Sequence, residues 1–260
     1  MGDLLLTPGQ YQALWIGLQV TVQLLLWSFC VGVVLSLIFG LMRLSENRIL
    51  RGVALCYVEL FRGISSIVLL FWFAFALPIL LDIGQPSRVI MSVFALGANM
   101  GGYGAEIVRG AILSVPKGQH EATTALNLSG YHRVRHIILP QALPVILPPF
   151  GNLTIEILKG TALVSLVGLR DLAFSAEILR TARTQMEVPI GVPELFINVL
   201  IIYFVLAQIV SLLFRLAERA VSARYRQRRG KRAIDVSDVA APGVTGAGAG
   251  AAGSSGAGGR

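Results

Sequence analysis

Three ionisable residues, Glu106, Glu156 and Lys159, lie within or beside long apolar stretches of the sequence. Ionisable groups at membrane depth are costly, and they usually face a cavity or a partner. Glu156 and Lys159 are three residues apart, so they can pair on one helix face. Two interpretations stay open for Glu156. Together with Lys159 and Glu106, it lines a path that receives the charged ends of a zwitterionic solute, or it belongs to a structural ion pair.

Catalytic patterns are missing from the sequence. His132 and His136 have the i, i+4 spacing of a zinc-binding pair, but the glutamate of the His-Glu-x-x-His motif is absent. The phosphate loop Gly-x4-Gly-Lys-Ser/Thr is absent too, because the only Gly-Lys pair, Gly230-Lys231, is followed by arginine. We therefore expect no enzyme, no cofactor and no metal, and any ATP hydrolysis must take place on another polypeptide.

Composition places the chain in a membrane. Of its 260 residues, 55% are hydrophobic and only 14% are charged, whereas soluble domains carry about 25% charged residues. The mean hydropathy is +0.72. The missing charges are concentrated in charge-free runs, which is typical of transmembrane helices. We predict an all-α, polytopic membrane protein.

Five apolar segments are long enough to form spans, given that about 20 residues cross the hydrocarbon core. Pro8 and Gly9 are expected to delay the first helix, and Pro144, Pro148 and Pro149 to break the fourth. Small residues four apart (Ser36 and Gly40, Gly97 and Gly101) indicate close helix packing. The predicted spans are Leu14–Leu41, Val53–Leu81, Val89–Leu113, Ala142–Ile155 with a continuation at Gly160–Leu169, and Leu195–Phe214.

Basic residues set the predicted orientation. They follow the first, third and fifth spans, and the largest group lies between Arg215 and Arg232. The positive-inside rule then places the N-terminus outside and the C-terminus in the cytoplasm of a bacterial inner membrane. Because the basic run directly follows an apolar helix, we expect contact with membrane lipid and not with nucleic acid. The predicted organisation is a periplasmic N-terminus (1–13), a transmembrane domain (14–219) and a cytoplasmic tail (220–260), disordered from Val236 onward.

A polar loop, residues 115–140, joins the third and fourth spans on the predicted cytoplasmic side. Residues 119–128 contain good helix formers, and we expect Gly130 to end that helix. Residues 131–139 predict a second short helix, which Pro140 should stop. The loop therefore predicts two short helices that meet at a bend outside the membrane.

The same loop resembles the EAA loop of ABC importer permeases, whose pattern is Glu-Ala-Ala, three residues, Gly, nine residues, then Ile-x-Leu-Pro. Thr123 replaces the second Ala and Asn127 replaces Gly, and asparagine tolerates the left-handed backbone better than most residues. The resemblance implies that the loop docks on an ATPase subunit, with small Ala122 and Thr123 at the contact and Glu121 pairing with a basic group. The matching residues are Glu121, Ala122, Thr123, Asn127, Gly130, Ile137, Leu139 and Pro140.

Further segments resemble the polar amino-acid branch of these permeases: Tyr57–Gly63, Tyr103–Gly110, and Leu158–Ser165 with departures at Gly160 and Ala162. The resemblance, over about residues 10–225, implies a type I permease fold, a cytoplasmic ATPase subunit, an extracytoplasmic solute-binding protein and a second permease subunit, either a copy or a sister chain. It implies import of a polar amino acid; opines and compatible solutes such as ectoine stay open. The alternative class is a secondary transporter or channel without an ATPase.

Overall fold

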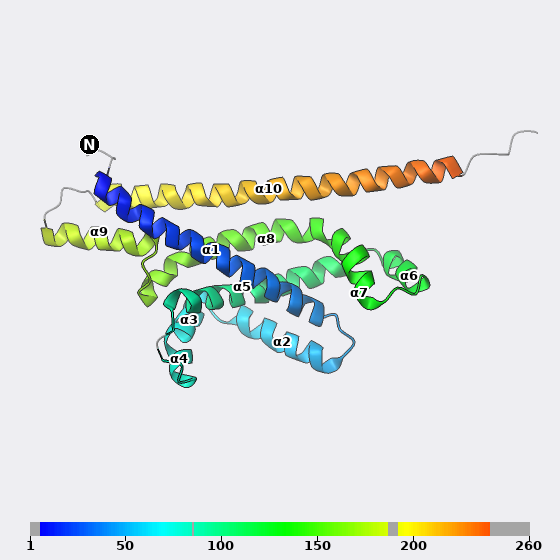
Figure 1. Cartoon of the computed structure of the whole chain (residues 1–260), viewed down its shortest axis with the longest axis horizontal. Coiled ribbons are helices and arrows are strands. Elements are labelled where there is room, and N and C mark those ends of the chain that lie inside the picture. The colour runs from blue at the N-terminus through cyan, green and yellow to red at the C-terminus, as the bar shows by residue number, and fades with distance from the viewer. Residues whose placement is uncertain (1–5, 85, 187–191, 240–260) are drawn as a thin grey trace, which may run out of the picture. The chain divides into compact units, whose positions relative to one another are not determined.

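The computed structural model describes residues 6–84, 86–186 and 192–239, and these residues form helices and no strand (Figure 1). The chain divides into two compact units, Met1–Val221 and Ser222–Arg260. The packing of helices given below lies within the first unit. The elements are α1 (Pro8–Met42), α2 (Arg48–Gly63), α3 (Ser66–Phe71), η1 (Trp72–Ala76), α4 (Leu77–Leu80), α5 (Arg88–Leu113), α6 (Lys117–Ala125), α7 (Gly130–Arg133), η2 (Val134–Ile138), α8 (Leu139–Thr161), η3 (Ala162–Val167), α9 (Leu172–Met186) and α10 (Val192–Val239).

Three described helical stretches are long and apolar enough to cross a bilayer: Pro8–Met42, Gly130–Val167 and Val192–Ala223. A fourth is obtained if the bent pair Arg48–Gly63 and Ser66–Leu80 counts as one span. The predicted third span, Val89–Leu113, corresponds to α5, which is not among these stretches and which packs against α1, α2, α3 and α8. The all-α, multi-span architecture predicted from composition is therefore confirmed.

The first helix begins earlier than predicted, at Pro8. Proline suits the first turn of a helix, because the N–H that it lacks has no intrahelical acceptor there. Thr7 precedes it, and the Thr7 backbone N–H donates to the Gln10 side chain at 2.8 Å. Pro8 therefore starts the helix and does not delay it.

The second predicted span is not one helix from Val53 to Leu81. The chain leaves α2 at Ile64, where the backbone is extended, and α3 sets off at an angle of 105°. The segment after the bend continues through a π-helical turn, η1, into α4. The sequence prediction was wrong here because it had no means of detecting the side chains of α5 that hold the bend.

The prolines of the fourth span also behave differently from the prediction. Pro140 does not stop the preceding helix, and Pro144, Pro148 and Pro149 all lie inside α8. The π-helical turn η2 directly precedes Pro140 and absorbs the missing N–H and the bulk of the ring. Interior prolines are tolerated in membrane helices where neighbouring helices and local readjustments satisfy the freed backbone groups. The predicted continuation, Gly160–Leu169, ends α8 and forms the 3-10 turn η3.

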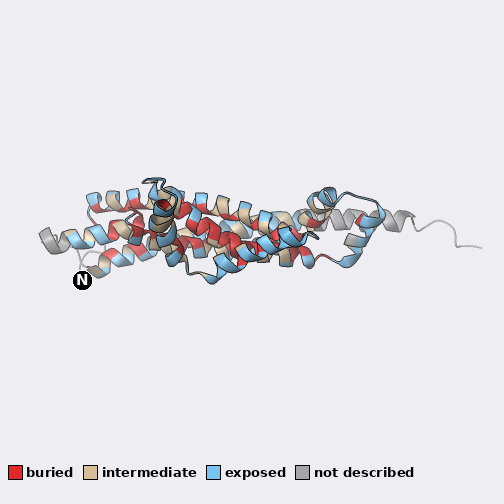
Figure 2. Ribbon diagram, turned by 90° about the horizontal axis from the view of Figure 1, so that it is seen from below, coloured by how far each residue is buried: buried red, intermediate tan, exposed pale blue. Residues whose placement is uncertain are grey.

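Helices α1 and α5 cross closely because small residues line the contact, as predicted. A Cβ atom added to Gly40 would lie 2.9 Å from the Ala105 carbonyl oxygen, and one added to Gly97 would lie 2.8 Å from Val31. A Cβ on Gly101 would lie 2.7 Å from Leu35. Without a hydrophobic drive between helices in lipid, such packing is what stabilises the bundle. Buried residues accordingly run along the middle of the bundle (Figure 2).

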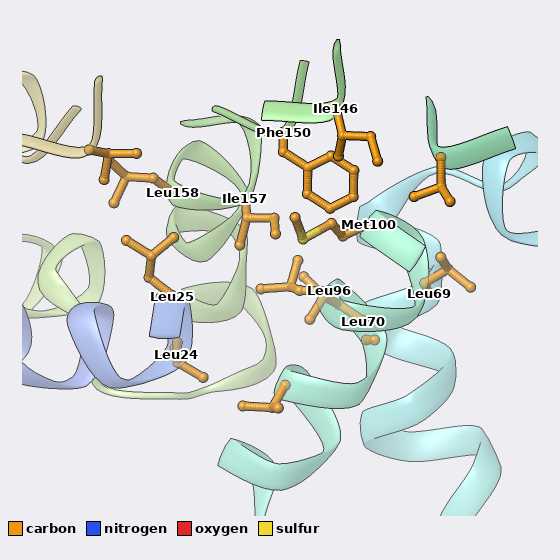
Figure 3. Close-up of a cluster of buried hydrophobic side chains, with 14 of the residues drawn as sticks. Leu24, Leu25, Leu69, Leu70, Leu96, Met100, Ile146, Phe150, Ile157 and Leu158 are labelled. Atoms are coloured by element: carbon orange, nitrogen blue, oxygen red, sulfur yellow. The ribbon is translucent and has the colours of Figure 1, made fainter. Parts of the chain in front are cut away.

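The main core joins residues of α1, α3, α5, η2, α8, η3 and α10 through large aliphatic and aromatic side chains, part of which Figure 3 shows. A second, smaller core lies where α1, α9 and α10 meet and includes Leu14, Leu172 and Leu195. Many large apolar residues outside these cores are exposed, as a lipid-facing surface requires. The labelled members of the main core are Leu24 and Leu25 from α1, Leu69 and Leu70 from α3, Leu96 and Met100 from α5, and Ile146, Phe150, Ile157 and Leu158 from α8.

Candidate functional site

The loop between α5 and α8 forms one separate short helix, α6, as predicted, whereas the predicted second short helix is wrong, because the helix that begins at Gly130 runs through η2 into α8 without a break. Helix α6 ends at Ala125, and the turn falls at Asn127 and not at Gly130. Asn127 has a φ of 50°, in the left-handed region, which agrees with the expectation that asparagine would replace the glycine of the family pattern there. Gly130 instead begins α7, where Ser129 accepts a hydrogen bond from the His132 backbone N–H.

One side of α6 is open and the other is attached to the body. Glu121 and Ala122 are exposed, whereas Thr123 is buried. The Gln141 side chain, on α8, donates to the Gln119 side-chain oxygen at 3.2 Å. This hydrogen bond attaches α6, the helix that bears the exposed residues, to α8.

The last residues of the loop, which match the Ile-x-Leu-Pro end of the family pattern, attach it to the main core. Ile137 and Leu139 are partly buried against the main core, and Ile138 between them is buried. Pro140 is exposed at the start of α8. Near the turn, Leu126 and Tyr131 expose 70% and 63% of their surface. Two exposed apolar side chains beside an exposed carboxylate form a surface suited to a protein partner.

A small cavity with a mainly apolar lining lies between α3, α5 and α8. Its volume is about 20 Å³, which is enough for a water molecule but not for an amino acid. The lining combines an apolar floor with four polar side chains, including the predicted Glu156. The lining residues are Ser66, Leu96, Asn99, Met100, Tyr103, Leu153, Glu156, Ile157 and Gly160.

Of the three ionisable residues chosen from the sequence, only Glu156 lines this cavity. Its side chain is exposed, as is that of Lys159. The anticipated pairing of Glu156 with Lys159 is not among the ion pairs of the described residues. Glu156 is therefore accessible, at the edge of this cavity, and is not held by its neighbour on α8.

Glu106 occupies a different place, one turn beyond Tyr103 on α5. Its carboxylate is 3.1 Å from Arg43, at the end of α1, and 2.9 Å from Arg109. The Arg109 side chain also donates through Nε at 3.0 Å. This cluster ties α1 to α5 and is absent from the cavity lining.

Sequence reasoning missed three polar residues of the cavity as site residues: Ser66, Asn99 and Tyr103. Asn99 offered a signal, because it is the one amide side chain in the charge-free run Val89–Ala105. Tyr103 was noted only as part of a motif. Ser66 gave no signal, since its position depends on the bend between α2 and α3.

The fold and the exposed loop define a multi-span membrane permease that works with a separate energy-supplying subunit. Comparison with known proteins agrees, because the model of the family described as "Binding-protein-dependent transport system inner membrane component" matches residues 32–223. The chain belongs to this family. It is therefore a membrane permease subunit of an ABC importer, not an enzyme, and ATP is hydrolysed on another subunit.

Two curated relatives and one solved structure illustrate the similarity. The chain is 44% identical over 217 residues to a "Probable amino-acid ABC transporter permease protein y4tF" of Sinorhizobium fredii, covering 82% of this chain and 88% of the relative. It is 32% identical over 215 residues to the glutamine transport system permease protein GlnP of Escherichia coli, covering 83% and 92%. The structure described as "Crystal structure of an amino acid ABC transporter with histidines" superimposes with a TM-score of 0.70 at 32% identity, covering 81% and 94%.

Proposed function

We propose that this permease forms the path for a polar amino acid entering the cell. We further propose that the loop 115–140 binds a cytoplasmic ATPase subunit and transmits its conformational change to the membrane helices. The proposal is carried by one observation: α6 exposes Glu121 and Ala122 and is bonded to α8 through Gln119 and Gln141. On α8 also lies Glu156, at the cavity. In this account a displacement of α6 passes through this hydrogen bond to α8, the helix that also lines the cavity.

The docking contact uses small and charged groups. The small, exposed Ala122 allows the backbone of α6 to approach a partner groove closely, and Glu121 pairs there with a basic side chain; Thr123, which the sequence also placed at this contact, is buried against the body. The exposed Leu126 and Tyr131 add apolar area to the contact. In this account the loop lies in the cytoplasm, the N-terminus lies outside, and the C-terminus is cytoplasmic.

The chemistry of the cavity favours a solute with an ammonium group. Glu156 supplies a carboxylate, and Ser66, Asn99 and Tyr103 supply neutral hydrogen-bonding groups. A carboxylate in a partly apolar site attracts a cation and repels an anion. Two relatives whose names describe amino-acid and glutamine transport support an amino acid as the solute of this chain. Opines and compatible solutes carry similar charged groups, so the same transport mechanism would also serve them.

A second permease subunit, a copy or a sister chain, completes the path. Val145 of α8 exposes 49% of its surface, and Asn152 and Glu156, which share its helix face by α-helical spacing, are also exposed. A partner subunit on this side would cover Val145 and enclose Glu156. An extracytoplasmic binding protein delivers the solute from outside.

The test is reconstitution of this chain in liposomes with its ATPase subunit and binding protein. We expect uptake of at least one of radiolabelled L-glutamine, L-histidine and L-arginine, dependent on ATP and on both partners. Liposomes that lack the ATPase subunit are the control. Uptake that needs only an ion gradient, with the permease alone, would contradict the proposal.

A further inference from the structure

The bend between α2 and α3 leaves backbone groups that must be satisfied inside the membrane. The last carbonyl groups of a helix have no intrahelical donor. Phe61 and Arg62 lie in the last turn of α2, before the chain turns away at Ile64. An unsatisfied carbonyl in a bilayer costs several kcal/mol (order of magnitude) because no water is available.

Side chains of α5 satisfy these carbonyl groups. The Asn99 side-chain nitrogen donates to the Phe61 carbonyl at 2.8 Å, and the Tyr103 hydroxyl donates to the Arg62 carbonyl at 3.2 Å. On the other side of the bend, the Ser66 hydroxyl donates to the Asn99 side-chain oxygen at 3.1 Å. Asn99 therefore holds both helices of the bent pair at once.

The residues that hold the bend also line the cavity. Ser66, Asn99 and Tyr103 form its polar wall, and Glu156 of α8 faces the same space. At about 20 Å³ the cavity is too small for an amino acid, so a solute can enter only if its walls move apart. The wall on the α3 side is attached to the bend.

We propose that Asn99 and Tyr103 are positioning residues that couple occupancy of the cavity to the angle between α2 and α3. This rests on the proposed function, because it takes the cavity as part of the solute path. A solute that bonds to Asn99 or Ser66 replaces a bond that holds the bend at 105°. The solute then binds with a different affinity when the angle changes. Such differential affinity is what shifts a conformational equilibrium.

The chain offers a matched control for this proposal. The Tyr57 hydroxyl, on α2, donates to the Ala98 carbonyl of α5 at 2.8 Å. This bond joins the same two helices as the bonds of Asn99 and Tyr103 to α2, but Tyr57 does not line the cavity. Tyr57→Phe therefore removes a bond between α2 and α5 without touching the cavity wall.

The experiment measures the bend in the assembled importer in liposomes. Spin labels are placed on the exposed Cys56 of α2 and on Leu80→Cys of α4, with Cys30→Ser, and their distance distribution is recorded by pulsed electron paramagnetic resonance. Recordings are made without solute and with L-glutamine, L-histidine or L-arginine at saturation. We expect the solute that is transported to shift the distribution, and Tyr57→Phe to preserve that shift.

Asn99→Leu and Tyr103→Phe should abolish the response. Loss of one net hydrogen bond changes a population ratio by about fivefold, so the solute-free distribution of either variant should already contain the second distance. Tyr103→Phe keeps the ring and serves if Asn99→Leu does not fold. Two results would overturn the coupling. Either the wild-type distance distribution does not change when the transported solute is added, or Asn99→Leu and Tyr103→Phe show the same solute-dependent shift as Tyr57→Phe.

Uptake by the same liposomes separates this failure from failure of the proposed function. If wild-type importer takes up solute with ATP but the bend does not respond, the function stands and the coupling is rejected. If no ATP-dependent uptake of the three amino acids occurs, the proposed function and the coupling fall together.

Discussion

The loop that contains α6 and the bend between α2 and α3 are both breaks in long helices, but they are built in opposite ways. The loop is exposed, and its features follow from residues close together in sequence, such as Asn127 with its φ of 50°. The bend is held by Asn99 and Tyr103, which lie 38 and 41 residues along the chain from the carbonyl groups of Phe61 and Arg62 to which they bond. The loop is specified by residues close together in the sequence, whereas the bend is specified by tertiary packing against α5.

The largest effect should follow from breaking the packing between α1 and α5, the helix whose side chains hold the bend. Gly40→Leu or Gly97→Leu places a side chain where even a Cβ would lie within 3 Å of α1 or α5, and overpacking costs about 3 kcal/mol. We expect a much lower melting temperature and little monodisperse protein in detergent. Gly52→Leu is the control, since nothing lies within 4 Å of a Cβ there. Equal melting temperatures for Gly40→Leu and Gly52→Leu would refute this packing.

The exposed break should respond in the opposite manner, losing function without losing the fold. Glu121→Lys or Ala122→Asp should leave the melting temperature unchanged but reduce uptake about tenfold, which corresponds to about 1.4 kcal/mol of docking energy. ATP hydrolysis by the assembled importer should then no longer depend on solute. Glu46→Lys, an exposed charge reversal in the loop between α1 and α2, is the matched control. Unchanged uptake in both α6 variants, at matched membrane levels, would defeat the docking proposal.

Glu156→Gln sharpens the comparison because it changes the cavity without altering α6. Removal of a carboxylate that binds a cationic group should weaken solute affinity by about five- to tenfold, the value of one charged hydrogen bond. The coupling of ATP hydrolysis to uptake should be kept. Measurement of uptake against solute concentration, with Lys159→Gln as control, checks this. If neither the affinity nor the range of transported solutes changes, Glu156 has no part in selectivity.

The smallest effect concerns the turn after α6. Asn127→Val places a β-branched residue at a positive φ, which costs about 1–2 kcal/mol, whereas Asn127→Gly removes that strain. We expect a reduction of uptake of a few fold for valine and none for glycine. Equal uptake by the two variants would mean that the angle of α6 does not matter for coupling.

Local features of the sequence predicted much of this molecule. Charge-free runs predicted an all-α membrane protein, and the spacing from Glu121 to Pro140 led to the permease family. Long-range features could not be predicted in the same way. Pro8 was misjudged although its cap, formed by Thr7 and Gln10, is local and could have been found in the sequence. The helix through Pro144, Pro148 and Pro149, by contrast, persists because its neighbours support it. The polar wall of the cavity depends on the 105° bend, to which nothing in residues 53–81 alone points.

The last two predicted features concern the ends of the chain. The disordered tail was predicted from Val236, but the structure describes helix through Val239, and residues 240–260 lie outside the described part. The division into residues 1–13, 14–219 and 220–260 stays a prediction. Positions in the tail do not enter the account of the path.

The most direct test of the central claim is thiol labelling of Ala122→Cys in a chain with Cys30→Ser and Cys56→Ser. A membrane-impermeant maleimide should label Ala122→Cys in inside-out vesicles but not in intact cells, and bound ATPase subunit should protect it. Ile83→Cys, in the exposed loop after α4, should show the reverse sidedness without protection. Labelling of Ala122→Cys from outside intact cells, or labelling that the ATPase subunit does not reduce, would contradict the account.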